Sequence, residues 1–250
     1  MQIYKHMDIG TAKPTEEEME GVAHHLIDLI EPGEDFSAGK YVQLADACVQ
    51  DILSRGKTAV IAGGTGLYVD SLIAGRSFAP VPQTGRREAL EAQLRETGGE
   101  AMLARLREID PEAAARLHPA DEKRVIRALE VYEETGKTIT QHNLETKAVP
   151  PRYRPVWIGL DYQDRAALYR RIDLRVENML SAGLLDEIRA LLALGVSPKT
   201  TAMQAIGYKE FFGYLSGACS LDEAAALVQE AVAWADEPPP ARNLVLEEIA

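Results

Sequence analysis

The sequence predicts an α/β fold in which an all-helical lobe is inserted into a parallel sheet core. Strand and helix patterns alternate in the N-terminal part of the chain, an order typical of parallel sheets. Residues 86–147 then show helical patterns and no convincing strand, before a strand pattern returns at Pro155. We therefore expect an α/β core from residues 1–85 and 150–235, and a helical insertion at 86–149.

Composition excludes several classes of protein. Apolar residues make up 46% and charged residues 26% of the 250 positions, which is ordinary for a globular chain and excludes wholesale disorder. No apolar run approaches the roughly 18 residues that suggest a membrane helix, and the N-terminus is unlike a signal peptide, so we expect a cytoplasmic protein. Cys48 and Cys219 lie far apart and outside any metal-binding spacing, so neither a disulfide scaffold nor a zinc site is expected.

The net charge of −12 has the wrong sign for a protein that holds nucleic acid by bulk attraction. The charge is unevenly distributed, however. Acidic residues dominate positions 218–250, whereas arginines outnumber aspartates over residues 152–175. A local basic surface is therefore compatible with the sequence, and net charge alone does not decide the partner.

The elements of the N-terminal part follow from caps, apolar spacing and turn residues. Thr15 and Glu18 have the spacing of a capping box, and apolar residues recur at helical spacing after Ser37 until Gly56. In order, we expect a short helix at 16–22, a strand at 24–30, a helix from Ser37 to Gly56, a strand at 58–62 and a helix at 67–74.

The remaining elements are mostly helical. Gly98-Gly99, Asp110-Pro111 and His118-Pro119 interrupt the lobe, and Ser220 with Glu223 predicts a further cap. We expect helices at 86–96, 100–109, 111–117 and 122–135, a strand at 155–161, and helices at 164–182, 184–194, 201–215 and 220–234. Residues 236–250 are acidic and rich in proline, so we expect a divergent, disordered tail.

The glycine-rich stretch 60–68 is the strongest candidate for chemistry. A glycine turn between a buried strand and a helix lets backbone amides approach an anion, and Thr65 adds a hydroxyl. Gly63 and Gly64 equally suit a tight turn with Thr65 as the helix cap. Residues 33–40 resemble a phosphate loop but have the wrong spacing, and Tyr41 stands where Ser or Thr is required.

Three further features have both functional and ordinary interpretations. Lys123, Arg124 and Arg127 share about one helical turn, which suits either a nucleic-acid contact or a solvated helix face. The helical pattern around Gly207 permits the close approach of a ligand or, more commonly, of another helix. One histidine of the doublet at 24–25 is expected to point inward and the other to solvent, and the alternative is that the doublet contains a catalytic base.

Together, these segments resemble the tRNA dimethylallyltransferase family of bacteria. The resemblance runs in order from residue 1 to about residue 232. Its motifs are MQIYKHMDIGTAKP (1–14), HHLIDLIEP (24–32), FSAGKY (36–41), VIAGGTGLY (60–68), HPADEKRVIRALEVYEETGK (118–137) and MQAIGYKE (203–210).

The resemblance implies an activity, partners and a fold. The family transfers a dimethylallyl group from dimethylallyl diphosphate to N6 of adenosine 37 in tRNA. Its fold is a P-loop NTPase-like parallel sheet core with a helical lobe that grips the tRNA anticodon stem-loop. The implied partners are therefore the tRNA anticodon stem-loop and dimethylallyl diphosphate, the implied cofactor is Mg²⁺, and a monomer without membrane contact is expected. No protein metal ligand is assigned.

The resemblance also assigns site residues, position by position. Thr65 is the implied catalytic residue, contacting tRNA and the departing diphosphate, and Gly63 and Gly64 are the implied diphosphate-binding residues. The implied tRNA-binding residues are Thr65, Arg87, Lys123, Arg124, Val125, Ile126, Arg127, Gln204, Ala205, Ile206, Gly207, Tyr208 and Lys209. Hydroxyls and cations suit phosphate oxygens, whereas amides and aromatic rings suit base edges and stacking.

The sequence departs from the family pattern at both ends. The family has a strand, a GPTASGKT-type phosphate loop and an Asp-Ser pair before the motif that starts this chain, and a basic segment near Trp234. None of these is present, so we expect the core without its first strand, phosphate loop and general base. The chain as written is then expected to be inactive, or slower by well over about 10²–10⁴-fold. The alternatives are a non-catalytic tRNA-binding remnant, an adenylate isopentenyltransferase-like enzyme and, least favoured, an unrelated kinase fragment.

Overall fold

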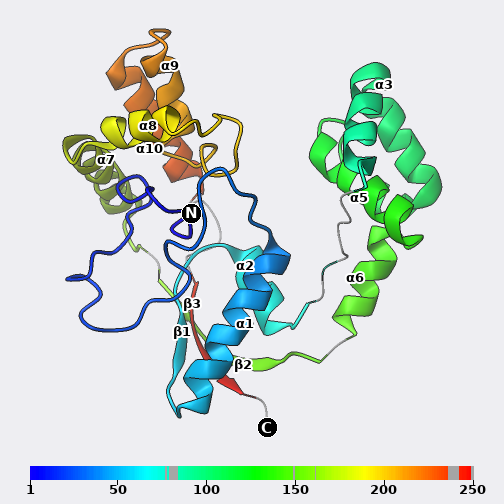
Figure 1. Cartoon of the computed structure of the whole chain (residues 1–250), viewed down its shortest axis with the longest axis horizontal. Helices are drawn as coiled ribbons and strands as arrows, with labels where there is room; N and C mark the ends of the chain where they lie inside the picture. Colours follow the sequence, from blue (N-terminus) through cyan, green and yellow to red (C-terminus); the bar gives the residue numbers. More distant parts are fainter. Residues whose placement is uncertain (77, 79–83, 149, 161, 236–241, 249–250) are drawn as a thin grey trace. The chain divides into compact units, whose positions relative to one another are not determined.

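The computed structural model describes residues 1–76, 78, 84–148, 150–160, 162–235 and 242–248 (Figure 1). The chain divides into two compact units. The first unit combines Met1–Val69 with Arg154–Ala250, and the second unit is the continuous segment Asp70–Tyr153. The helical insertion expected at 86–149 falls inside the second unit. None of the helices within the described part of the chain is long and apolar enough to cross a membrane.

The first unit is helix-rich and contains the three strands found among the described residues, except for Tyr153, the first residue of the second strand. Its elements are α1 (Ala38–Ser54), β1 (Ala59–Ile61), the start of α2 (Gly66–Ile73), β2 (Tyr153–Gly159), α7 (Arg165–Ser181), α8 (Leu184–Ala193), the 3-10 helix η1 (Lys209–Phe211), α9 (Phe212–Leu215), α10 (Leu221–Ala235) and β3 (Arg242–Glu248). Ser37 begins α1 by accepting a hydrogen bond from the Lys40 amide at 3.2 Å. Ser220 and Glu223 form the expected reciprocal cap at the start of α10.

The sheet differs from the parallel arrangement that the sequence predicts. Its strand order is β1-β3-β2, and β1 pairs with β3 in the antiparallel direction, with Val60 opposite Val245. Residues 242–248 thus form a strand where we expected a disordered tail. The cause is local: Leu244-Val245-Leu246 is a run of high strand propensity, which the acidic and proline-rich composition around it conceals.

The N-terminal segment is a folded loop rather than the expected helix and strand. The capping bonds between Thr15 and Glu18 do form, but residues 16–22 make only turns, and Glu20 has a left-handed backbone with φ 49°. The strand expected at 24–30 is also wrong except at Ile30, which forms an isolated parallel bridge with Tyr4. Asp28 adopts φ 53°, a value incompatible with an extended strand.

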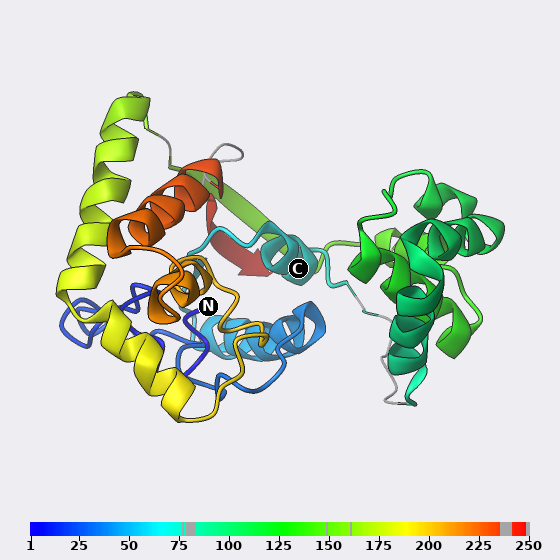
Figure 2. The same ribbon diagram turned by 90° about the horizontal axis from the view of Figure 1, so that it is seen from above.

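The core of the first unit joins the N-terminal segment to α7, α8 and α10. These helices lie side by side in both views (Figures 1 and 2). Its largest buried side chains include Tyr4 and Met7 from the N-terminal segment, Ile188 from α8, and Tyr208 and Phe211 near η1. The helix expected at 201–215 is instead a series of turns followed by η1 and α9, with Gly207 at φ 93°.

The second unit is a helical bundle whose core lies between α3 and α5. Its helices are the end of α2, α3 (Arg86–Ile109), α4 (Pro111–Ala114), α5 (Glu122–Thr135) and α6 (Ile139–Lys147). The expected break at Gly98 is present as a non-helical residue, φ 82° and ψ 164°, within the single span of α3. Leu106 and Leu129 are fully buried between the two helices. The bounds of α5 coincide with the predicted helix at 122–135.

Candidate functional site

The glycine turn between β1 and α2 is open. A Cβ added at Gly63, Gly64 or Gly66 would meet no other atom within 4 Å, and Gly63 has φ 152°. The Thr65 carbonyl accepts hydrogen bonds from the Tyr68 and Val69 amides at 2.9 and 3.2 Å, which starts the helix. Within the described ranges the exposed Thr65 hydroxyl has no hydrogen-bond partner. The turn therefore leaves the backbone amides of Gly63 and Gly64 and the Thr65 hydroxyl on the exposed surface, where an anion could reach them.

An aromatic group lies beside this turn and joins three of the quoted motifs. Tyr68 of α2 stacks on Tyr41 of α1 with ring centroids 4.6 Å apart, and Phe36 approaches Tyr68 edge-on at 6.2 Å. Burial, then the neighbouring Tyr68 and Asp35, raises the pKa of Tyr4. The Tyr4 hydroxyl is buried without a hydrogen-bond partner. The motifs at 1–14, 36–41 and 60–68 therefore come together in space.

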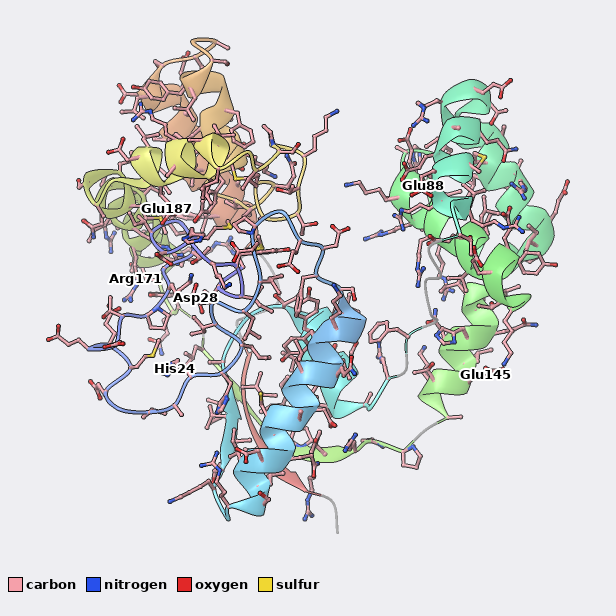
Figure 3. All side chains as sticks on the ribbon, viewed as in Figure 1. His24, Asp28, Glu88, Glu145, Arg171 and Glu187 are labelled. Atoms are coloured by element: carbon pink, nitrogen blue, oxygen red, sulfur yellow. The ribbon has the colours of Figure 1, made fainter. Side chains whose placement is uncertain are left out.

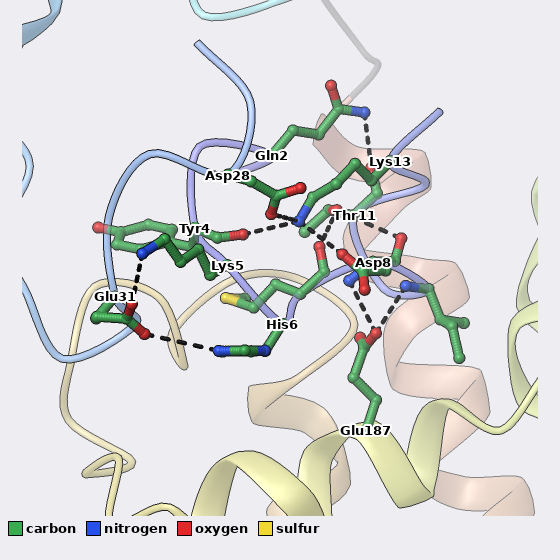
Figure 4. Close-up of polar contacts among 12 residues, drawn as sticks. Gln2, Tyr4, Lys5, His6, Asp8, Thr11, Lys13, Asp28, Glu31 and Glu187 are labelled. Carbon is green, nitrogen blue, oxygen red and sulfur yellow. Dashed lines mark hydrogen bonds and ion pairs between the residues drawn. The ribbon is translucent and has the colours of Figure 1, made fainter. Parts of the chain in front are cut away.

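Glu187 of α8 connects two distant motifs. Its Oε2 accepts hydrogen bonds from the backbone amides of Asp8 and Ile9, both at 2.8 Å (Figure 4). Its Oε1 accepts from the Gly10 amide at 3.1 Å and from the Tyr208 hydroxyl at 2.7 Å. Burial, and then this bond to Glu187, raises the pKa of Tyr208, so its hydroxyl stays protonated as a donor.

Two further contacts fix the N-terminal loop. Tyr208 packs so closely that a Cβ at Gly10 would lie 2.5 Å from its Cζ atom, which only glycine avoids. The Lys13 ammonium, on a side chain only 5% exposed, donates to the Asp8 carboxylate at 2.6 Å, to the Tyr4 carbonyl at 2.9 Å and to Asp28 (Figure 4). The loop is therefore held by the Glu187 carboxylate at residues 8–10 and by the Lys13 ammonium at Asp8 and Tyr4.

The predicted tRNA-binding stretch 204–209 presents some residues to solvent and buries others. Gln204, Ile206 and Lys209 are exposed, and the Gln204 amide donates to the Pro198 carbonyl at 2.8 Å. Ala205 is partly buried, and Gly207 and Tyr208 are buried. Only the first three side chains are available to a ligand, whereas Tyr208 acts inside the protein.

In the second unit, one buried carboxylate binds two of the predicted arginines. Glu130, whose side chain is 3% exposed, pairs through Oε2 with Arg127 at 2.9 Å and with Arg87 at 3.3 Å. The two arginine side chains remain 30% and 42% exposed. Arg87 also pairs with Glu91, one turn along α3, at 3.4 Å. The structure thus brings Arg87 and Arg127 together at a partly exposed position.

The other predicted residues of α5 divide between surface and core. Lys123 is exposed, and the Arg124 guanidinium lies 3.9 Å from the Asp121 carboxylate. Val125 and Ile126 are 1% and 3% exposed and belong to the core of the second unit. Their side chains are packed against other helices and are not presented to a ligand.

Sequence reasoning missed the acidic residues that organise these sites. Glu187 falls within an ordinary amphipathic helix pattern, and its partners lie 177–179 positions away, so no local spacing marks it. Glu130 stands within a quoted motif three residues after Arg127, a spacing that does predict their ion pair. The expectation for the histidine doublet is wrong, because His24 and His25 are both exposed and His24 lies on an outer loop away from Glu187 (Figure 3).

The His, Cys, Asp and Glu side chains that the structure describes do not form a metal site. Across the described residues, no group of three or more His, Cys, Asp or Glu side chains is arranged to hold a metal ion.

Comparison with known proteins identifies close relatives. Residues 2–233 match the family described as IPP transferase. A tRNA dimethylallyltransferase of Caldanaerobacter subterraneus subsp. tengcongensis is 45% identical over 232 residues, covering 92% of this chain and 74% of that protein. One from Acetivibrio thermocellus is 47% identical over 230 residues, covering 92% and 73%.

Solved structures of tRNA isopentenyl and dimethylallyl transferases are also similar to this chain. The full-length tRNA isopentenylpyrophosphate transferase of Bacillus halodurans is similar with a TM-score of 0.60 and 37% identity, covering 94% of this chain and 72% of that one. A eukaryotic dimethylallyltransferase acting on tRNA is similar with a TM-score of 0.75 and 27% identity, covering 94% and 59%.

Proposed function

The chain belongs to the IPP transferase family. From this membership we propose, in place of the inactivity expected from the departures at its two ends, that it transfers a dimethylallyl group from dimethylallyl diphosphate to N6 of adenosine 37 in tRNA. In this reaction the N6 nitrogen forms a bond to the allylic carbon, the carbon–oxygen bond to diphosphate breaks, and a proton leaves N6. The observation that carries the proposal is the match over residues 2–233, joined to relatives at least 45% identical over nine-tenths of the chain.

The open turn in the first unit suits the diphosphate. We propose that the amides around Gly63 and Gly64 and the Thr65 hydroxyl receive the leaving group, whose negative charge increases as the bond breaks. What supports this assignment is that the turn is exposed, unobstructed and begins a helix. The strand, glycine turn and helix in this order also support a P-loop NTPase-like core, although β1 itself pairs with β3 in the antiparallel direction.

The cationic and amide side chains suit the RNA. We propose that Arg87, Lys123 and Arg127 contact the phosphate backbone of the anticodon stem-loop, because cations that remain partly exposed can pair with phosphate oxygens. Gln204 and Lys209 are proposed to contact the nucleotides near the target base. The target base must leave the stack to react, as in other enzymes that modify bases.

The remaining parts of the proposal concern the setting of the reaction. We propose that Mg²⁺ arrives bound to the diphosphate oxygens and that no cluster of protein ligands is required. We also propose a monomer that acts in the cytoplasm, where its proposed tRNA substrate is found. Sedimentation of the purified protein with and without RNA tests the oligomeric state.

The decisive experiment combines binding and transfer. The purified protein is incubated with radiolabelled dimethylallyl diphosphate and an anticodon stem-loop that carries adenosine at position 37. A matched stem-loop with guanosine there lacks the 6-amino group and serves as the control. Product formed only with the adenosine stem-loop supports the proposal. Binding of the stem-loop without any transfer would identify an RNA-binding protein instead, and the absence of both would refute the proposal.

A further inference from the structure

We propose that Glu187 is a positioning residue that sets the conformation of the proposed RNA-contacting stretch 204–209. It would act through the Tyr208 hydroxyl and through the loop Asp8–Gly10. The inference rests on the proposed function, because the stretch matters only if it contacts RNA. It adds a residue that contacts neither RNA nor the reacting atoms.

The geometry of the carboxylate is the first argument. Three consecutive backbone amides and one hydroxyl converge on its two oxygens within 2.7–3.1 Å. Figure 4 shows two of these contacts, those from the Asp8 and Ile9 amides. Hydrogen bonds to an ionised acceptor are the strong ones, and all four donors here require an acceptor. A glutamine at this position would present one NH₂ group to these donors. The site therefore selects a carboxylate and not merely a polar side chain.

The backbone of the loop is the second argument. His6 and Ala12, on either side of the bound amides, have φ 62° and φ 48°, values that non-glycine residues seldom adopt and that cost of order 1 kcal/mol or more each. Such a backbone persists only where surrounding contacts determine it. Glu187 supplies that contact in the middle of the loop, between the two strained positions.

The contact between the loop and Tyr208 is the third argument. The Gly10 backbone packs directly against the Tyr208 ring, since a Cβ added at Gly10 would lie 2.5 Å from the Tyr208 Cζ atom. Tyr208 in turn lies within the stretch that presents Ile206 and Lys209 to solvent. A displacement of the loop is therefore expected to displace the residues proposed to contact RNA. The N-terminal motif approaches Tyr68 and the glycine turn through Tyr4, whereas residues 8–10 contact Glu187 and Tyr208.

The test compares Glu187→Gln with Asp186→Asn. Asp186 is the adjacent residue on α8, its side chain is 82% exposed, and it pairs only with Arg189 among the residues that the structure describes. Both changes replace a carboxylate with an amide, so they differ in the contact with the loop. Tyr208→Phe is a second variant that removes one hydrogen bond and keeps the ring against Gly10. Amide hydrogen exchange, the Kd for the stem-loop and the KM for dimethylallyl diphosphate are measured for each.

The expected pattern separates positioning from general stability. Glu187→Gln should lose exchange protection at residues 8–10 and bind the stem-loop about tenfold more weakly, the effect of losing roughly one charge-assisted hydrogen bond. The KM for dimethylallyl diphosphate should stay within about twofold. Tyr208→Phe should shift the RNA Kd in the same direction by less, and Asp186→Asn should match the wild type.

Two results would overturn the inference alone, and a third would overturn it together with the proposed function. The first is a Glu187→Gln protein whose folded fraction falls while the folded molecules keep the wild-type Kd for RNA, which would make Glu187 purely structural. The second is equal weakening by Asp186→Asn. If the wild-type protein keeps its exchange protection but binds no stem-loop, the proposed function fails, and the inference is overturned with it.

Discussion

Replacing Glu130 with glutamine tests how the helical unit holds its two arginines. The change removes the negative charge that faces Arg127 at 2.9 Å and Arg87 at 3.3 Å. Removing one partner of a fully buried ion pair costs about 3–5 kcal/mol, but here both arginine side chains are partly exposed and regain hydration. We therefore expect the free energy of unfolding of the second unit to fall by about 2 kcal/mol, near the value of a hydrogen bond to a charged group.

Glu91→Gln is the matched control, because it makes the same chemical change next to the same arginine. The Glu91 side chain is 43% exposed, and its ion pair with Arg87 spans one helical turn at 3.4 Å. Exposed pairs of this kind contribute about 0.3–0.5 kcal/mol. Native-state hydrogen exchange of the α5 amides in the intact protein measures both changes. Equal effects of the two substitutions, or stabilisation by Glu130→Gln, would refute the argument that burial decides the strength of the pair.

Three further changes have expected outcomes. Gly10→Ala places a methyl group 2.5 Å from the Tyr208 ring and should lower the free energy of unfolding of the first unit by about 1–3 kcal/mol. An unchanged melting temperature would contradict the close contact. Burial raises the pKa of Asp110, but hydrogen bonds from the Thr140 amide and hydroxyl outweigh it, so the net pKa is lowered. Its stabilising effect is then present above the unfolded pKa of about 3.9 and is lost as pH falls through the lower folded pKa, so Asp110→Asn should flatten acid unfolding curves of the second unit. Thr65→Ala should leave the melting temperature unchanged and slow single-turnover transfer by about 10²-fold; an unchanged rate would remove Thr65 from the reaction centre.

The elements that the sequence predicts well carry local determinants at their ends. Ser37 and Ser220 cap α1 and α10 through bonds to residues three positions on, and Gly136 ends α5 with φ 70°. The Gly98 break is equally local, since glycine readily adopts its φ of 82°. The open glycine turn also follows from the sequence, because a short apolar strand, three glycines and a helix pattern are adjacent in the chain.

The parts that sequence reasoning misses depend on distant contacts. Residues 24–30 have an apolar pattern that favours a strand, yet Asp28 turns to meet the Lys13 ammonium and adopts a left-handed backbone. Tyr208 was expected to face a ligand but is instead the internal partner of Glu187 and Gly10. No spacing rule connects residues so far apart, so these contacts emerge only when the chain is folded.

The bonds of Glu187 also impose an order on biosynthesis. The carboxylate and its amide partners are 177–179 positions apart, and ribosomes add about 5–20 residues per second, so the N-terminal loop waits roughly 9–36 s for its acceptor. The helical unit is one uninterrupted segment, Asp70–Tyr153, and is complete before α8 is translated. A nascent chain would thus carry a finished bundle while the amides of residues 8–10 still lack their carboxylate acceptor.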